Sequence, residues 1–296
     1  MTISGARVTQ RRHSTGWRGP GRAILGMILA ALTLGLAAAP ATAEDDGGAS
    51  GQAVSLTPHE ARYELRLISR ADGSPVIGAR GAMHYRITDT CDGWAMESRT
   101  HLDLSYARAD SVRTDWSFIS WESKDSTQYR FRIRSERNGA VQELIDGRAR
   151  MDPGEGGVAT FSHPEEKTMD LAPDVMLPAE HTFAALRAAR QGKRIFTVPM
   201  FDGSEPAGPM QATAVLIEAV PAGAPSELAD HALLAGPSWR MVLSFFAPDS
   251  TGSLPEYEIR LRYHANGVAQ EIIQDFGTMA LRASLKELTP LDDDGC

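Results

Sequence analysis

The two residues in this 296-residue sequence that are best placed to do chemistry together are His101 and Asp103. On a predicted strand they would share one face, because successive side chains of a strand point to opposite faces. An imidazole and a carboxylate on one face could ligate a metal ion or act as an acid/base pair. The strand around them is otherwise polar, so an ordinary solvated or hydrogen-bonded pair is the interpretation we favour.

Motifs that would place such residues in a familiar kind of active site are missing from the sequence. It has neither G-x-S-x-G nor H-E-x-x-H, the commonest signatures of serine hydrolases and zinc proteases. Asp202-Gly203-Ser204 is predicted to form a turn, and the acidic runs Glu165-Glu166 and 292–294 lack the alternating ligands of a calcium loop. We therefore expect no catalytic residue, no metal and no cofactor, and we expect that the protein is not an enzyme.

Arginines provide a second candidate site, one for an anionic ligand. Seven of them fall on single faces of three predicted strands: Arg130, Arg132 and Arg134 on the first, Arg260 and Arg262 on the second, and Arg62 and Arg66 on the third. If these strands were neighbours, the arginines would form a cationic patch able to bind phosphates or carboxylates. The alternative, which we favour, is ordinary cross-strand pairing with Glu64, Glu136 and Glu258.

Residues 1–43 have the three parts of a secretory signal peptide. Five arginines and no acidic residue form the basic start, residues 23–39 form an apolar run, and "ATA" at 41–43 is a small-x-small site for cleavage before Glu44. A membrane anchor is the alternative, because an apolar run of this length approaches what is needed to cross a bilayer. Pro40 and the cleavage site argue against an anchor, so we predict export and no membrane-spanning segment after cleavage.

The charge of the exported chain limits its partners. Cleavage would leave 25 basic and 38 acidic residues, a formal net charge of −13. Binding to nucleic acid requires basic surface that neutralises phosphates. We therefore expect no nucleic-acid partner.

The predicted export also bears on the two cysteines of the chain, Cys91 and Cys296. In an oxidising compartment, two cysteines in one domain are usually bonded to each other. A structural disulfide is thus the interpretation we favour. A redox pair, an intermolecular bridge and two free thiols remain the alternatives.

Alternation of period two dominates the sequence from Val54 onward and predicts an all-β, mainly antiparallel fold. About a dozen strands are expected in a single domain over 54–296, which follows an acidic, glycine-rich leader at 44–53. The strand patterns at 129–137 and 257–264 are each followed by Asn-Gly, which favours the type I′ turn of a hairpin.

One segment, residues 177–193, has a convincing helical pattern. Pro178 suits a first turn, Gly192 is a common C-terminal stop, and the charges agree with the helix dipole. A rod of roughly 20 Å could fill the hollow of a curved sheet. The connection 221–238, rich in proline, glycine and alanine, is expected to be a surface excursion between strands, and a mobile lid is the alternative.

Three stretches of the chain resemble the EipB family of alphaproteobacterial periplasmic proteins: "CDGW" at 91–94, "LPAEHTFAALRAARQGKRIFTVPMFDGSE" at 177–205 and "YEIRLRYHANGVAQEIIQDF" at 257–276. The resemblance extends from about Val54 to Cys296. It implies an open, spiral-like antiparallel β-barrel with one main helix, a periplasmic location and a need for the protein in cell-envelope integrity. By position, the disulfide of the family would join Cys91 to Cys296, and the resemblance points to a tetratricopeptide-repeat protein or another envelope component as partner.

Taken together, these features favour a non-catalytic binding or scaffold module that maintains the cell envelope. A carrier of lipid or lipoprotein is the alternative, because a curved sheet around a helix can enclose an apolar hollow. A hydrolase of an envelope polymer is a third hypothesis, and it would require His101 for turnover.

Overall fold

The computed structural model describes residues 54–248 and 254–292. The predicted signal peptide, the leader and Cys296 lie outside this part of the chain. Within it there are fourteen strands, one α-helix and one short 3₁₀ helix: β1 (His59–Arg70), β2 (Val76–Asp89), β3 (Gly93–Tyr106), β4 (Val112–Ser123), β5 (Gln128–Arg137), β6 (Ala140–Asp152), β7 (Gly156–His163), β8 (Lys167–Leu171), α1 (Pro178–Arg190), β9 (Ile195–Met200), β10 (Met210–Val220), η1 (Ala232–Leu234), β11 (Ser238–Phe246), β12 (Tyr257–His264), β13 (Ala269–Asp275) and β14 (Met279–Pro290).

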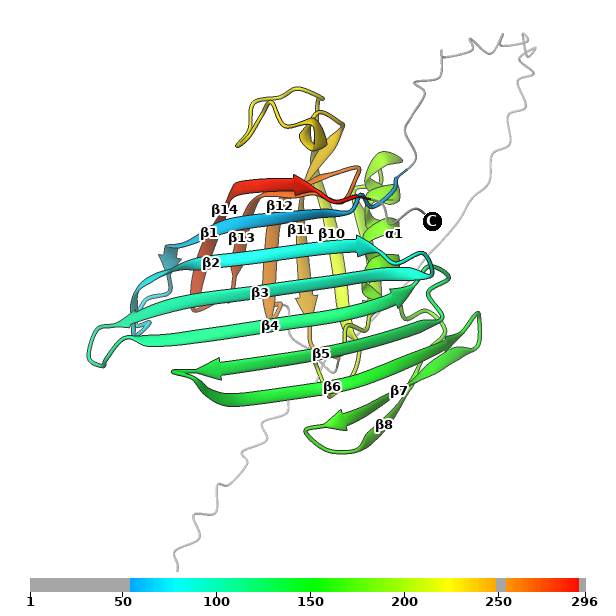
Figure 1. Ribbon diagram of the computed structural model, residues 1–296, viewed down its shortest axis with the longest axis horizontal. Helices are drawn as coiled ribbons and strands as arrows, with labels where there is room; N and C mark the ends of the chain where they lie inside the picture. Colours follow the sequence, from blue (N-terminus) through cyan, green and yellow to red (C-terminus); the bar gives the residue numbers. More distant parts are fainter. Residues whose placement is uncertain (1–53, 249–253, 293–296) are drawn as a thin grey trace, which may run out of the picture. The chain divides into compact units, whose positions relative to one another are not determined.

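All fourteen strands belong to one antiparallel sheet in the order β8-β7-β6-β5-β4-β3-β2-β1-β14-β13-β12-β11-β10-β9. The first strand, β1, lies in the middle of this order and pairs with both β2 and β14. The chain therefore runs from the middle to one edge at β8, reaches the opposite edge at β9, and returns to the middle. The sheet curls, so that β10–β13 lie behind β2–β4 in Figure 1. The predicted all-β, open, spiral-like architecture is confirmed.

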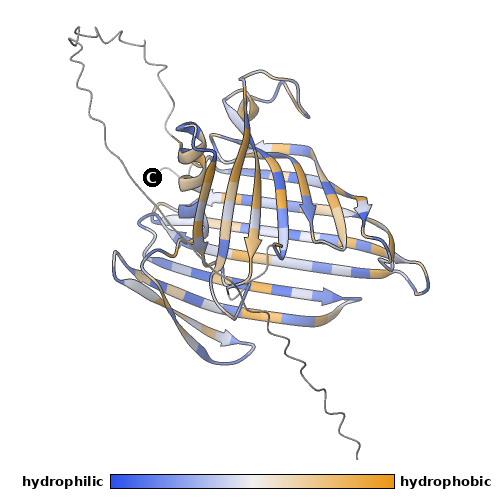
Figure 2. Ribbon diagram, turned by 180° about the vertical axis from the view of Figure 1, so that it is seen from behind, coloured by the Kyte–Doolittle hydropathy of each residue, from blue (hydrophilic) through white to orange (hydrophobic). Residues whose placement is uncertain are grey.

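The hairpin β5–β6 forms because its strands alternate between buried and exposed side chains. Tyr129, Phe131 and Ile133 are buried, while the arginines between them are exposed. Asn138 and Gly139 have φ angles of 50° and 79°, as the predicted type I′ turn requires. The same alternation of hydrophobic and hydrophilic residues is visible along most strands in Figure 2.

The second Asn-Gly pair also lies in a hairpin, β12–β13, but the prediction of a type I′ turn is wrong there. Gly267 has φ 85°, but Asn266 is not left-handed, and the Gly267 amide donates to the His264 carbonyl at 2.9 Å. This is a three-residue loop, a type I turn followed by a left-handed glycine. After β13 the chain turns again at Gly277, with φ 73°, and continues as β14.

The helix α1 follows the edge strand β8 in the chain and lies against β9 and β10, at the opposite edge of the sheet. It begins at Pro178 and is followed by Gly192 in the left-handed conformation, close to the predicted bounds. The segment before it touches the opposite edge, since the Met176 amide donates to the Pro199 carbonyl at 2.9 Å and the Met176 carbonyl accepts from Phe201 at 3.0 Å. None of the described helices has the length and apolar character that a membrane span requires.

Side chains inside the curve form two hydrophobic clusters. The larger one joins α1 to β1–β3 and β9–β14, and the smaller one lies over β4–β8. Four aromatic rings dominate the smaller cluster, with centroids 5.5 to 6.5 Å apart: Tyr129, Phe131, Phe161 and Phe201. The N-terminal turn of α1 lies at the boundary of the clusters, because Leu177 packs in the smaller one and Leu186 in the larger one.

Candidate functional site

A cavity of about 300 Å³ lies inside the curve, between α1 and the inner faces of strands from both halves of the sheet. Its wall is mostly apolar and aromatic, and includes Met83, Trp94, Leu243, Phe245 and Ile272. The first two turns of α1 complete this wall. Concave apolar cavities with a few polar groups are the usual form of small-molecule binding sites.

The carboxylate of Glu122 fixes the start of α1 at this cavity. Glu122 lies near the end of β4 with its side chain buried, and its two oxygens accept the backbone amides of Ala179 at 2.6 Å and Glu180 at 2.9 Å. The N-cap residue of α1, Leu177, makes no capping hydrogen bond of its own. Free amides at the start of a helix need acceptors, so Glu122 serves as the cap from a different element.

The two ionisable groups other than tyrosine among the described lining residues are Glu122 and His181. Burial raises the pKa of Glu122 to about 7, although the hydrogen bonds from the helix amides act in the opposite direction. Burial lowers the pKa of His181 to about 4. Between about pH 4 and pH 7 both groups are therefore uncharged, because desolvation disfavours the charged form of each.

The tyrosines of the wall are neutral as well. Burial raises the pKa of Tyr63, Tyr85 and Tyr263, and the Tyr63 hydroxyl donates to the Ala269 carbonyl at 2.8 Å. Among the described residues that line the cavity, no nucleophilic side chain is hydrogen-bonded to Glu122 or His181 in the way that covalent catalysis requires. The arrangement suits binding of an apolar molecule.

Neither Glu122 nor His181 was singled out from the sequence. On β4 the inner face carries Phe118, Ser120 and Glu122, whereas Ile119 is 43% exposed on the outer face. On β4 the apolar Ile119 thus lies on the outer face, while the polar Ser120 and Glu122 lie on the inner face. A period-two pattern of hydrophobic residues would assign the two faces the other way round, so it does not identify Glu122 as buried. A signal does exist in the sequence, since the helix begins without a capping side chain of its own.

Comparison with known proteins agrees with this architecture. A family model described as EipB-like matches residues 50–292. The chain belongs to the EipB-like family. It is 25% identical over 252 residues to the cell envelope integrity protein EipB of Brucella abortus, a match that covers 83% of this chain and 89% of that protein. It is also similar to the crystal structure of a β-barrel-like protein of a domain of unknown function from Brucella abortus, with a TM-score of 0.75 and 23% identity over 81% of this chain and 100% of that one.

The structure describes one of the two cysteines of the predicted family disulfide. Cys91 follows β2, has a φ of 66° and is disulfide-bonded. Cys296 lies outside the described residues. The pairing of Cys91 with Cys296 stays a prediction.

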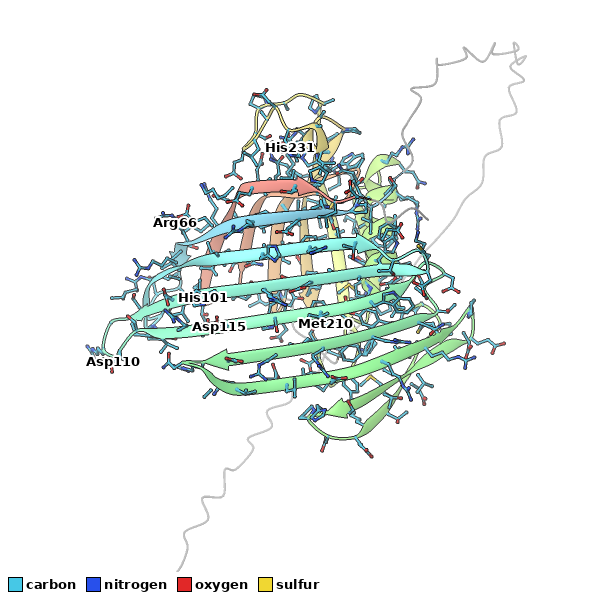
Figure 3. The ribbon with its side chains drawn as sticks, viewed as in Figure 1. Arg66, His101, Asp110, Asp115, Met210 and His231 are labelled. Atoms are coloured by element: carbon cyan, nitrogen blue, oxygen red, sulfur yellow. The ribbon has the colours of Figure 1, made fainter. Side chains whose placement is uncertain are left out.

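His101 lies on the outer face of the sheet, away from the cavity. Its closest acidic partner is Asp115, directly opposite on β4, at 2.6 Å from Nδ1 to Oδ1, while Asp103 lies 3.9 Å from Nε2 (Figure 3). The His101 and Asp115 side chains are 42% and 43% exposed. Within 54–248 and 254–292 no three metal-ligating side chains gather. His101 is thus in the solvated, hydrogen-bonded state that the sequence favoured, but its close partner is Asp115 and not the predicted Asp103.

The single cationic patch does not form, because the three strands are not neighbours. Six strands separate β5 from β12, and β1 lies between them. The glutamates do pair with the arginines, but along one strand rather than across strands: Arg66 with Glu64 at 2.9 Å, Arg134 with Glu136 at 2.5 Å and Arg260 with Glu258 at 3.6 Å. Arg132 pairs across strands with Asp146 at 2.6 Å.

Arg130 keeps part of the predicted character. It lies directly opposite Arg148 of β6, and its guanidinium lies 5.4 Å from the centre of the Trp121 ring. Like charges opposite each other on neighbouring strands destabilise a sheet. The predicted anionic-ligand site is thus reduced to the outer face around Arg130 and Arg148.

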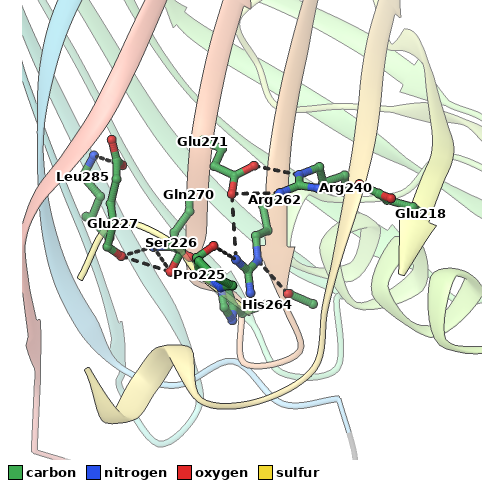
Figure 4. A network of polar contacts seen from close by, with 11 residues as sticks. Glu218, Pro225, Ser226, Glu227, Arg240, Arg262, His264, Gln270, Glu271 and Leu285 are labelled. Atoms are coloured by element: carbon green, nitrogen blue, oxygen red, sulfur yellow. Dashed lines mark hydrogen bonds and ion pairs between the residues drawn. The ribbon is translucent and has the colours of Figure 1, made fainter. Parts of the chain in front are cut away.

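Arg262 cannot belong to an exposed patch, because it is fully buried beneath residues 221–237, which we call the docked loop. Its Nε donates to Ser238 at 2.8 Å, and its Nη1 lies 3.4 Å from the Pro225 carbonyl and 3.8 Å from Glu271 (Figure 4). Gln270 also binds the loop, through the Glu227 carbonyl at 2.6 Å. These contacts attach the connection to the sheet and agree with the surface excursion that the sequence favoured over a mobile lid.

Proposed function

We propose that this protein is a periplasmic, non-catalytic binding module that supports the integrity of the cell envelope, and that it binds an apolar ligand in the cavity beneath α1. The observation that carries the proposal is the cavity itself, about 300 Å³ of mostly apolar lining at the junction of helix and sheet. The relative from Brucella abortus carries the name cell envelope integrity protein. The sequence signals for export support the location.

A carrier of lipid or lipoprotein is the second candidate. It is favoured by the open sheet, whose edges β8 and β9 do not pair with each other and meet through side chains instead, among them Phe201 against Phe131 and Phe161. Because no strand pairing closes this seam, the sheet could open there to release a bound chain. Transfer of a labelled acyl chain from vesicle to vesicle, faster with protein than without it, would favour the carrier over a module that retains its ligand. A tetratricopeptide-repeat partner stays a prediction.

The proposed binding can be tested with a fluorescent apolar probe such as N-phenyl-1-naphthylamine. Ala185 is buried and lines the cavity from α1. Ala185→Leu would fill part of the space with three further carbon atoms, and we expect it to weaken probe binding about tenfold, since each buried methylene contributes about 0.8 kcal/mol.

Arg187→Leu is the matched control, because it introduces the same side chain on the exposed side of the same helix. Circular dichroism would establish that both variants keep the fold. Equal probe affinity in the two variants, or no probe binding to the natural protein, would rule out the cavity as the binding site.

A further inference from the structure

A row of side chains crosses the outer face of seven neighbouring strands, from β2 to β8 (Figure 1). The strand registers place these residues directly opposite one another, in the order Thr88, Ala95, Trp121, Arg130, Arg148, Thr160 and Thr168. The row thus holds two arginines side by side and no acidic residue. Because like charges directly opposite each other destabilise a sheet, this arrangement requires an explanation.

The protein itself does not neutralise the two arginines of the row. Both are exposed, and neither forms an ion pair with any residue in 54–248 or 254–292. Two acidic residues of β6 are paired with other arginines instead: Asp146 with Arg132, at 2.6 Å from Oδ2 to Nε, and Asp152 with Arg150, at 3.4 Å. The centre of the row therefore carries two positive charges that are available to a ligand.

Trp121 holds Arg130 in place at this site. The indole Nε1 of Trp121 donates to the Thr90 hydroxyl at 3.0 Å, and its ring lies over Gly93, where a Cβ atom would come within 2.5 Å of two ring atoms. The guanidinium of Arg130 lies 5.4 Å from the centre of this anchored ring, in a cation–π contact. An arginine held in this way loses less conformational freedom on binding a ligand than a free one does.

The centre of the row forms the floor of a groove of about 660 Å³ on the outer face. Donor groups meet there from two sources: the guanidiniums of Arg130 and Arg148, and the hydroxyl of Thr160, which lies directly opposite Arg148 on β7. The complementary ligand is an anion, since arginine forms two parallel hydrogen bonds to the oxygens of a phosphate or a carboxylate.

The number of donors favours phosphate over carboxylate. Directly opposite residues on paired strands have Cα atoms about 5 Å apart, so both guanidiniums can reach one anion. Two bidentate guanidiniums and one hydroxyl supply about five donors. A carboxylate accepts at about four positions on two oxygens, whereas a phosphate monoester has three free oxygens. A phosphate monoester can therefore use every donor of the groove.

We propose that Arg130, Arg148 and Thr160 form a binding site for a phosphate monoester on the outer face of β5–β7. The site lies on the opposite face of the sheet from the cavity beneath α1, so it goes beyond the proposed function, and either can fail without the other. Small soluble phosphate esters and lipid headgroups share this chemistry, and the experiments distinguish them.

The test is calorimetric titration of the purified protein, at low ionic strength, with glycerol 3-phosphate and with glycerate, which carries a carboxylate on a similar skeleton. We expect the phosphate to bind at least tenfold more tightly than the carboxylate. Arg148→Gln is expected to weaken binding of glycerol 3-phosphate about tenfold, because a pair of charge-assisted hydrogen bonds is lost.

Arg150→Gln is the matched control. It removes the same charge from the same face of β6, two residues away, but from an arginine that is already paired with Asp152. We expect it to change the affinity less than twofold. Equal weakening by Arg148→Gln and Arg150→Gln would show that the attraction is diffuse and would overturn the site. Absence of glycerol 3-phosphate binding, or glycerate binding as tightly as the phosphate, would overturn it as well.

Two further measurements locate the ligand and identify its source. The NMR signal of the Trp121 indole N–H, assigned by its loss in Trp121→Phe, is expected to shift with glycerol 3-phosphate in the natural protein and not in Arg130→Gln; a signal that stays in place in the natural protein would contradict the proposal. With glycerol 3-phosphate bound, co-sedimentation with vesicles of phosphatidylcholine and phosphatidic acid that is lost in Arg148→Gln supports the site with a lipid headgroup as ligand, and no co-sedimentation supports it with a soluble phosphate ester.

Discussion

Glu122 and His181 have pKa values shifted in opposite directions, so their effects on the free energy of unfolding oppose each other as the pH changes. Replacing one of the two is therefore expected to give a pH dependence of stability that differs from that of the natural protein. For Glu122 the folded-state pKa of about 7 lies above the ordinary value of 4.5. The folded protein therefore binds this proton more tightly than the unfolded chain does. The stabilisation is fully present below pH 4.5 and is lost as the pH rises through 7. Since one pKa unit corresponds to about 1.4 kcal/mol, the loss amounts to about 3 kcal/mol.

His181 works in the other direction. Its folded-state pKa of about 4 lies below the ordinary value of 6.5, so its contribution is present above pH 6.5 and is lost as the pH falls through 4, again by about 3 kcal/mol. Between pH 4.5 and 6.5 the contribution of Glu122 falls with pH while that of His181 rises at the same rate. The two slopes cancel in this window.

Glu122→Gln is the informative change, because an amide resembles the neutral acid and cannot ionise. The free energy of unfolding, measured by urea at pH 4 to 8, is expected to increase in this variant relative to the natural protein by about 3 kcal/mol across that range. His181→Leu is expected to give the opposite trend, also by about 3 kcal/mol. Taking differences at each pH removes the contribution of all other titrating groups. A difference that stays constant with pH for Glu122→Gln would refute the buried, raised-pKa carboxyl group.

Three further predictions concern sites outside the cavity. Replacing Cys91 or Cys296 by serine is expected to lower stability by the same amount as replacing both, up to about 5 kcal/mol for so long a closed loop. Denaturation without reductant measures this loss, and additive losses in the double variant would contradict a bond between the two cysteines. Arg262→Met is expected to release the docked loop, seen as limited proteolysis within it at protease levels that leave the natural protein intact, because the arginine contacts a loop carbonyl; an unchanged cleavage rate would show that the loop is held by other contacts. Arg148→Glu is expected to raise stability by about 0.5 kcal/mol by pairing with Arg130 and to weaken salt-sensitive retention on immobilised phosphate; unchanged retention would remove the anionic-ligand site.

The parts of the fold that are local in sequence could be predicted, and those that depend on distant pairing could not. The hairpin β5–β6 follows from alternation and Asn138-Gly139, which act over a few residues. The pairing of β1 with β14 joins the two ends of the domain, and nothing in either strand specifies the other. For this reason the arginines of β5 and β12 could be assigned to one face of the sheet but not to one patch.

The candidate site was hidden for a related physical reason. Whether a polar side chain on a strand faces water or the interior depends on which face is covered, and on β4 the covered face carries Ser120 and Glu122 while Ile119 is left outside. In the same way, His101 was found by its type and spacing, but its partner Asp115 comes from the register between β3 and β4. Residue types predict which groups can react, and register determines which of them meet.

Glu122 both joins the helix to one half of the sheet and sets the charge of the cavity wall. The edges β8 and β9 lie at opposite ends of the strand order but are consecutive in the chain, so the segment with α1 has to cross from one to the other. Glu122 anchors the start of that helix to β4, in the half of the sheet that ends at β8, while the helix itself packs mainly on the other half. Ionisation of Glu122 above about pH 7 places a charge in the wall and costs stability, although the charged form is the stronger acceptor for the helix amides. Below about pH 7 the joint between the two halves is therefore held by a neutral carboxyl group, and above that pH by a carboxylate whose charge the apolar wall disfavours.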